Sequence, residues 1–354
     1  IDEYVEQDFA RVVLDEAQYI KNPLTQVARA AKRLPAGVRF ALTGTPIENR
    51  LSELWSIFDF LMPGLLGTRE SFAKRFESPV EHAEGDSAAR LQALVSPFVL
   101  RRVKEDVVAD LPEKIEDTVM ARLTGEQRKL YLANQDRIAQ QVQHREAGEF
   151  KKDKLKVLAE LTKLRQICCD PRLHYEDYKA GSAKLDMCME LVHGAVDGGH
   201  RILLFSQFTG MLDIIGKRLA KEDIAFLKLT GASSKESRAK MVAQFQAGEV
   251  PVFLISLKAG GVGLNLTAAD VVIHYDPWWN VAAQDQATDR AHRIGQQHTV
   301  TVYKLIAKDT IEERIMQMQE SKRDLVNSVL GGDGISSALF TREDVLALLG
   351  GDGR

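Results

Sequence analysis

The chain has 354 residues, enough for two compact domains with appended helices. Hydrophobic residues make up 45% and charged residues 27% of the sequence, as in ordinary globular proteins, and we find neither a membrane-spanning run nor an export signal. The formal net charge of −3 gives no support for nucleic-acid binding, which has to rest on local basic surfaces. We therefore expect a cytoplasmic protein that does not contact membranes.

The three cysteines cannot build a disulfide framework, which fits a reducing compartment. Cys168, Cys169 and Cys188 also lack the paired CxxC spacing of a zinc site. We interpret them as small core residues.

The first 67 residues predict part of a parallel α/β sheet. Apolar strands at 11–14 and 39–42 flank a helix at about 25–33. A second helix is predicted from residue 51 onward, because apolar residues recur there at i, i+3, i+4 and i+7. These residues are Leu51, Leu54, Trp55 and Phe58.

Residues 68–180 are mostly helical and charged in pattern, and we interpret them as a helical insertion. From residue 181 the pattern alternates between apolar strands and amphipathic helices, which indicates a parallel sheet covered on both faces. The predicted strands are 201–205, 226–229, 252–256, 271–275 and 300–305. A last helix from residue 311 and a glycine-rich tail complete residues 310–354.

Two polar motifs follow the first two strands. Asp15 and Glu16 stand at the end of strand 11–14, where one carboxylate can hold Mg²⁺ and the next can orient or deprotonate a water. Two solvated acidic residues are an equally good interpretation of this motif alone. Thr43-Gly44-Thr45 follows the second strand and could couple a nucleotide site to a moving partner, although a plain structural turn also explains it.

A glycine-rich motif runs from Ser256 to Leu266 and follows a predicted strand. Such a turn presents backbone N–H groups to an anion, here a DNA phosphate or a nucleotide, and tight packing is the alternative. Its candidate residues are Ser256, Lys258, Ala259, Gly260, Gly261 and Gly263.

The strongest motif spans Gln286 to Gln296. Arg290 and Arg293 are spaced i, i+3, which predicts that both project from one helix face. Two adjacent guanidiniums repel each other, and a triphosphate would satisfy both as the partner of arginine fingers. A solvated basic face is the alternative.

In this order the motifs resemble those of helicase superfamily two, and specifically its SWI/SNF-like branch. Three further stretches separate this branch from ordinary helicases, and Cys168-Cys169 after Gln166 is similar to prokaryotic members. These stretches are PFVLRRVK at 97–104, LTKLRQ at 161–166 and YDPWWN at 275–280. The resemblance covers nearly the whole chain.

The resemblance implies an α/β fold with a complete second RecA-like lobe at 181–309. It also implies a C-terminal remnant of the first lobe at 1–67, helical protrusions at 68–180 and a bracing helix and tail at 310–354. The implied activity is that of a DNA-stimulated ATPase that uses ATP and Mg²⁺, tracks double-stranded DNA without separating its strands, and displaces DNA-bound proteins. We expect a nucleoid-associated monomer.

The resemblance also implies roles for individual residues. Asp15 and Glu16 would serve the metal and water, and Arg290 and Arg293 would act as fingers. Nucleotide binding or coupling falls to Gln18, Thr43, Gly44, Thr45, Gly263, Gln286 and Gln296. DNA contacts fall to Ser206, Gln207, Ser256, Lys258, Ala259, Gly260, Gly261, Trp278, Trp279, Arg101 and Arg102, although one tryptophan is expected to serve packing and the two arginines could instead brace the lobes.

The sequence contains no phosphate-binding loop of the form GxxxxGK[ST]. Residues 210–218 have one residue too many between the glycines, and Arg218 stands where a hydroxyl should be. The chain starts at Ile1, and we expect a piece of a longer protein that hydrolyses ATP feebly or not at all by itself. The alternative is a non-catalytic module that docks DNA or proteins, including RNA polymerase.

Overall fold

The computed structural model describes residues 2–44, 51–78, 87–100, 102, 111–143, 147–260, 264–278, 281–317 and 342–350. The chain divides into two compact units. The first consists of residues 1–102, 279–282 and 319–339, and the second of residues 103–278, 283–318 and 340–354. The division at residue 102 falls inside the segment 68–180, so the two halves of that segment belong to different units. Each unit is described by itself.

The first unit is built on two parallel strands, β1 and β2, which pair from Phe9↔Ala36 to Leu14↔Ala41. Thr25 caps the helix between them, since its hydroxyl accepts the Ala28 N–H at 3.2 Å. The helices and strands are α1 (Asp2–Val5), β1 (Phe9–Leu14), the 3₁₀ helix η1 (Ala17–Ile20), α2 (Gln26–Arg33), β2 (Ala36–Ala41), α3 (Leu51–Leu61), α4 (Arg69–Phe72), the π-helical turn η2 (Ala73–Glu77), α6 (Ser87–Val95) and the 3₁₀ turn η3 (Ser96–Phe98).

Helix α3 is buried on two faces. Its predicted apolar stripe packs Leu54 and Phe58 against α4, η2 and α6, which confirms the expected amphipathic helix. The opposite face places Ile57 and Phe60 against α2 and the sheet. Helix α3 therefore joins the two small apolar clusters of this unit.

The second unit contains a six-stranded, wholly parallel sheet in the order β3-β8-β7-β4-β6-β5. All five strands predicted from the sequence are present. The elements are β3 (Lys114–Arg122), α8 (Gly125–Gln143), α9 (Ala147–Cys169), the 3₁₀ turn η4 (Pro171–Leu173), α10 (Ala183–Asp197), β4 (Ile202–Ser206), α11 (Thr209–Lys221), β5 (Phe226–Leu229), α12 (Lys235–Gln246), β6 (Val252–Ser256), α13 (Leu257–Gly260), β7 (Val271–His274), α14 (Val281–Thr288), β8 (Val300–Lys308) and α16 (Arg342–Leu348), with residues 311–317 also helical.

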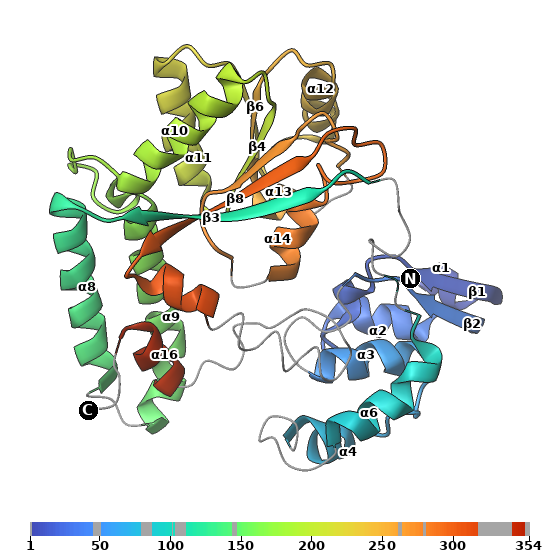
Figure 1. The fold of residues 1–354 in the computed structure, drawn as a ribbon. Coiled ribbons are helices and arrows are strands. Elements are labelled where there is room, and N and C mark those ends of the chain that lie inside the picture. Colours follow the sequence, from blue (N-terminus) through green and yellow to red (C-terminus); the bar gives the residue numbers. More distant parts are fainter. Residues whose placement is uncertain are drawn as a thin grey trace. The chain divides into compact units, whose positions relative to one another are not determined.

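Helices cover both faces of this sheet, as the alternation predicts. Ile202 and Leu204 of β4 face α10 and α11, whereas Leu203 and Phe205 face α12 and α14. Figure 1 shows α10 and α11 on one side of the sheet and α12 on the other. The residues of β4, β6 and β7 are all buried, which explains their unbroken apolar sequences.

Strand β3 was not predicted from the sequence. It lies within residues 68–180 and forms one edge strand of this sheet. It pairs with β8 along its whole length, from Lys114↔Val300 to Arg122↔Lys308. Glu116 sits between Lys114 at 2.7 Å and Lys304 at 2.6 Å. Burial would raise the pKa of Glu116, but hydrogen bonds from both lysines lower it to about 2.

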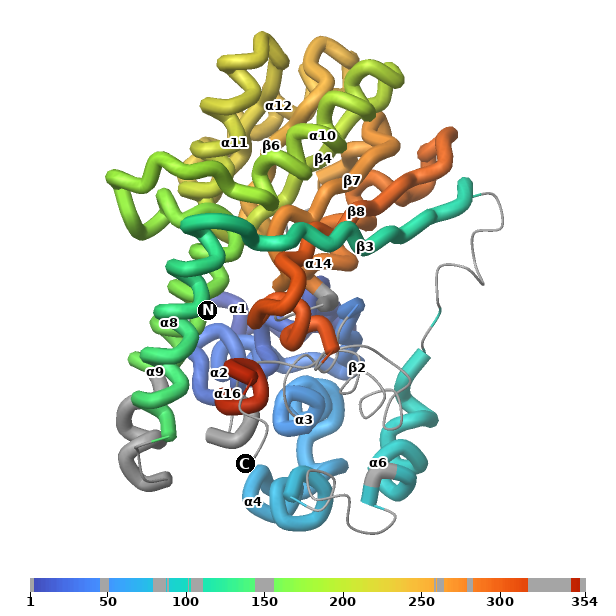
Figure 2. Tube along the Cα trace, turned by 60° about the vertical axis from the view of Figure 1, so that its left-hand side comes forward, coloured from blue at the N-terminus to red at the C-terminus, as the bar shows by residue number. Residues whose placement is uncertain are grey.

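Helices α8 and α9 lie side by side and receive α16 against them (Figure 2). The Gln135 amide on α8 donates to the Leu349 carbonyl at 2.7 Å, and Arg314 donates to the Leu348 carbonyl at 2.9 Å. The C-terminal helix is therefore part of the second unit.

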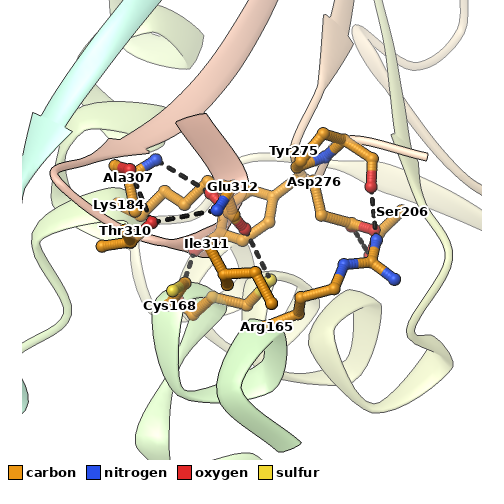
Figure 3. A network of polar contacts seen from close by, with 12 residues as sticks. Arg165, Cys168, Lys184, Ser206, Tyr275, Asp276, Ala307, Thr310, Ile311 and Glu312 are labelled. Carbon is orange, nitrogen blue, oxygen red and sulfur yellow. Dashed lines mark hydrogen bonds and ion pairs between the residues drawn. The ribbon is translucent and has the colours of Figure 1, made fainter. Parts of the chain in front are cut away.

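A fully buried ion pair lies beneath the carboxyl edge of the second sheet. The Lys184 ammonium is 2.6 and 2.7 Å from the two carboxylate oxygens of Glu312, and both side chains are wholly inaccessible. Glu312 also accepts the Ala307 N–H at 2.8 Å (Figure 3). Burial would lower the pKa of Lys184, but the Glu312 carboxylate outweighs it and raises the pKa, so the lysine is charged.

Replacing Glu312 by Gln leaves the Lys184 charge buried without its partner, and we expect the free energy of unfolding to fall by about 3–5 kcal/mol. The double variant Lys184→Met, Glu312→Leu removes both charges and is expected to be more stable than Glu312→Gln. Urea denaturation followed by circular dichroism measures both values.

The matched control is Glu222→Gln, the same change in the surface ion pair with Arg218, and it should cost far less. A double variant less stable than Glu312→Gln would show that the pair is not linked as described.

Candidate functional site

In the first unit, the ends of β1 and β2 are held together beyond the last paired residues. The Leu42 N–H donates to the Leu14 carbonyl at 2.8 Å, and the Ala17 N–H donates to the Leu42 carbonyl at 2.8 Å. The acidic motif and the threonine motif therefore lie next to each other at the carboxyl edge of this sheet.

Gln18 joins the two motifs by hydrogen bonds. Its amide Nε2 donates to Glu16 Oε2 at 2.7 Å, and the Thr43 hydroxyl donates to its Oε1 at 2.8 Å. A carboxylate only accepts, so the amide nitrogen faces Glu16 and the amide oxygen faces Thr43. The result is a relay from Glu16 through Gln18 to Thr43, all half-buried.

The carboxylates of Asp15 and Glu16 make different hydrogen bonds. Glu16 has φ 52 and ψ 51, a left-handed conformation that is uncommon outside glycine, and its N–H donates to Asp15 Oδ1 at 2.9 Å. Asp15 is exposed and makes no other hydrogen bond to the described residues. An exposed carboxylate at a strand end fits Mg²⁺, which is commonly bound through one or two carboxylates, substrate phosphates and waters.

In the second unit, the expectation that Arg290 and Arg293 share one helix face is wrong. Helix α14 ends at Thr288, and residues 289–292 form turns. Arg290 is half-buried, and its carbonyl accepts the Leu266 N–H at 3.0 Å. Arg293 is exposed, and its guanidinium reaches the Leu264 carbonyl at 3.5 Å. Both arginines therefore contact the last residues of the glycine-rich motif.

Gln296 holds this turn from within. Its buried amide nitrogen donates to the carbonyls of Thr267, Ala269 and Ala291, and its amide oxygen accepts two backbone N–H groups. Every hydrogen-bonding group of the amide is used inside the unit. Gln296 therefore positions the arginine turn. The other predicted glutamine of this motif, Gln286, lies on α14 and is half-buried.

His274 supports the same region from the end of β7. Its Nε2 lies 2.8 Å from the Thr288 hydroxyl at the end of α14, and its ring stacks on Phe205 with centroids 5.5 Å apart. Burial lowers the pKa of His274 from 6.5 to about 3, and Lys304 adds to this. The imidazole is neutral at physiological pH.

A pocket of about 410 Å³ opens at the carboxyl ends of β4, β5 and β6. Its lining residues are Gln207, Thr209, Asp213, Lys228, Thr230, Gly231, Ala232 and Ser256. The predicted residues Gln207 and Ser256 both line the pocket. Gln207 is half-buried, and Ser256 is buried. It also adds Thr209 and residues 230–232, which the sequence analysis missed.

Ser206 does not face this pocket. It is fully buried, its hydroxyl donates to Asp276, and that hydroxyl accepts the Phe208 N–H at 3.1 Å. Ala259 is also buried. Ser206 and Ala259 therefore support the site from the protein interior.

Trp278 is half-buried and packs against the apolar cluster on the α12 and α14 side of the sheet. Gly44 and Arg102 are exposed. Lys258 and Gly260 lie on α13, whose backbone alone is described at these two residues. Five predicted residues lie outside the described residues: Thr45, Arg101, Gly261, Gly263 and Trp279.

The stretches 161–166 and 275–280 each supply a buried charged residue near the site to which the sequence alone gave no role. Arg165 comes from the first and Asp276 from the second.

The parallel sheet of the second unit has the fold of a helicase C-terminal lobe. The SNF2-related domain matches residues 2–173, and the helicase conserved C-terminal domain matches residues 183–295. The chain belongs to the SWI2/SNF2 family of ATPases.

Two solved structures are similar to this chain. The Sulfolobus solfataricus SWI2/SNF2 ATPase core domain is 38% identical, has a TM-score of 0.57, and covers 98% of this chain and 72% of its own. The same core in complex with dsDNA is 38% identical, with a TM-score of 0.54 and coverages of 94% and 70%.

Among curated relatives, an "Uncharacterized ATP-dependent helicase" of Mycoplasma pneumoniae is 41% identical over 343 residues, which is 97% of this chain and 32% of the relative. The DNA repair and recombination protein RAD26 of Saccharomyces cerevisiae is 35% identical over 344 residues, with coverages of 90% and 31%. The chain thus spans about a third of the length of these relatives. None of the helices among the described residues is long and apolar enough to cross a membrane.

The neutral, buried His274 predicts acid sensitivity. Between about pH 6.5 and pH 3 the unfolded state binds a proton at this position and the folded state does not. The free energy of unfolding therefore falls as the pH decreases, by up to about 1.4 kcal/mol per pH unit from this group.

Chemical denaturation of the wild type and of His274→Gln as a function of pH measures this contribution. The variant should show a shallower pH dependence below 6.5. The exposed His298→Gln serves as the control and should keep the slope of the wild type. Equal slopes for wild type and His274→Gln would contradict the assignment.

Proposed function

We propose that the chain is part of the motor of an ATP-dependent translocase that moves along double-stranded DNA and displaces bound proteins. The observation that carries the proposal is the Glu16–Gln18–Thr43 relay in a member of the SWI2/SNF2 family. A scaffold has no use for a half-buried carboxylate held through an amide to a threonine that follows the neighbouring strand. A motor uses such a relay to couple hydrolysis to movement.

Asp15 and Glu16 divide the nucleotide chemistry between them. Asp15, which is exposed, would hold Mg²⁺, and the ion would neutralise charge on the ATP phosphates. Glu16 orients the attacking water and accepts its proton, and Gln18 fixes the carboxylate for that task. Thr43 is placed to sense the state of Glu16 through the relay.

Arg290 and Arg293 are proposed to stabilise the charge that develops on the phosphates during hydrolysis. Guanidiniums suit this role because they present several donors and stay protonated. Gln296 and His274 hold the turn that carries both arginines, so these two residues act by positioning. Both fingers are therefore built on irregular backbone that side-chain hydrogen bonds hold in place.

The pocket at β4, β5 and β6 is proposed to bind a phosphate of the DNA strand. It offers the Gln207 amide, the hydroxyls of Thr209 and Thr230, and the exposed backbone around Gly231. Ser206 is assigned to positioning, because its hydroxyl is engaged by Asp276. A solved relative at 38% identity is a complex with dsDNA, which supports duplex DNA as the ligand. Binding to DNA would place the protein at the nucleoid.

In the full-length protein, Arg293→Ala should lower the DNA-stimulated rate of ATP hydrolysis by about 10³-fold or more while ATP affinity changes little, because the finger acts mainly on transition-state charge. Steady-state kinetics and binding of a fluorescent ATP analogue separate the two quantities. Arg218→Ala, which removes a surface arginine of α11, is the control and should leave both unchanged. Equal losses of rate and affinity would count against the finger role.

The 354-residue chain alone should release phosphate from ATP feebly or not at all, because its sequence lacks GxxxxGK[ST]. A phosphate-release assay with and without duplex DNA measures this. Robust turnover would contradict this expectation. DNA binding without turnover by the full-length protein would instead favour a docking module.

A further inference from the structure

Arg165 is a buried arginine that none of the proposed chemistry uses. It lies in the last turns of α9 with 2% of its surface exposed. Burial lowers the pKa of Arg165, because a guanidinium loses its hydration there. Retaining a buried charge is costly unless its donors are engaged and a negative charge lies nearby.

The donors of Arg165 reach the segments that follow two strands of the sheet. Nη1 donates to Gln207 Oε1 at 3.2 Å, beyond the end of β4, and Nη2 donates to the Pro277 carbonyl, beyond the end of β7. The guanidinium also lies over the Phe208 ring at 5.6 Å. One side chain of α9 thus contacts both segments, and Figure 3 shows Arg165 beside Asp276 and Ser206.

Asp276 supplies the negative charge. It is fully buried, accepts the Ser206 hydroxyl, and accepts the Gln207 N–H at 3.3 and 3.2 Å. Burial raises the pKa of Asp276, and the charge of Arg165 opposes that rise. Gln207 is therefore held twice, by Asp276 at its backbone and by Arg165 at its side chain.

The hydrogen bonds from Arg165 and to Asp276 together fix the orientation of the Gln207 amide. A guanidinium can only donate, so the amide oxygen must face Arg165 and Nε2 must point away from it. Nε2 is buried and has no hydrogen-bond partner among the described residues, and other atoms of Gln207 line the pocket with Thr230 and Ser256, so Nε2 must become accessible for a phosphate to reach it. An amide donor without a protein partner suits an incoming phosphate oxygen.

We propose that Arg165 is a positioning residue for DNA binding: it holds the Gln207 amide with its donors turned toward a DNA phosphate in the pocket. This inference rests on the proposed function of that pocket. Arg165 also donates to the Pro277 carbonyl, which follows β7 on the way to α14. It therefore links the DNA-binding pocket to the part of the chain that leads to the arginine turn.

The test measures the affinity of this chain for a short fluorescein-labelled DNA duplex by fluorescence anisotropy. Arg165→Lys keeps the positive charge next to Asp276 but cannot span both acceptors, so we expect about tenfold weaker binding, the effect of losing one aligned hydrogen bond. Arg137→Lys makes the same change in the α8–α9 ion pair with Glu160, and it should bind DNA as the wild type does.

A double-mutant cycle separates positioning from a merely structural role. Gln207→Ala should also weaken binding, and the double variant Arg165→Lys, Gln207→Ala should be no weaker than Gln207→Ala alone, because Arg165 acts through Gln207. Wild-type affinity for Arg165→Lys, or losses that multiply in the double variant, would overturn the proposal. Failure of the wild-type chain to bind duplex DNA would instead contradict the proposed function itself.

Gln207→Glu provides a second test that leaves Arg165 and its charge in place, should Arg165→Lys unfold. The glutamate keeps an acceptor for Arg165 but has no donor for a phosphate. We expect it to weaken DNA binding at least as much as Gln207→Ala does. Undiminished affinity of Gln207→Glu would overturn the proposed orientation of the amide.

Discussion

Four buried charges compensate one another beneath the carboxyl edge of the second sheet, and the architecture of that unit depends on them. Lys184 and Glu312 join the start of α10 to the segment after β8. Arg165 and Asp276 join the end of α9 to the segments after β4 and β7. Each charge is costly alone, so the helices and the strand ends must keep their relative positions. The helical segment around α9 is thereby fixed to the sheet.

This constraint explains how loops can carry the functional groups with defined geometry. The carboxyl ends of parallel strands bring several loops to one edge, where ligands of open α/β sheets bind. Side-chain amides then hold these loops: Gln18 in the first unit, Gln296 in the arginine turn and Gln207 at the pocket. An amide both donates and accepts, so one residue can fix a neighbour while presenting its other end.

The sequence predicted most of the second sheet because its central strands are buried on both faces and read as unbroken apolar runs. It did not predict β3, whose exposed edge position leaves a charged sequence without such a run. It placed Arg290 and Arg293 on one helix face because of their i, i+3 spacing, whereas the helix ends at Thr288 and the Arg290 carbonyl accepts the Leu266 N–H. The roles of Arg165 and Asp276 depend on contacts between residues 42 to 112 positions apart, which a single sequence does not reveal.

The central claim is that the chain belongs to a motor that moves along duplex DNA. Displacement of the third strand of a DNA triplex by the full-length protein tests this most directly, because the third strand leaves only when a motor passes beneath it. We expect ATP-dependent release of the third strand while the underlying duplex stays paired. Robust DNA-stimulated ATP hydrolysis without release of the third strand, or release accompanied by separation of the duplex, would contradict it.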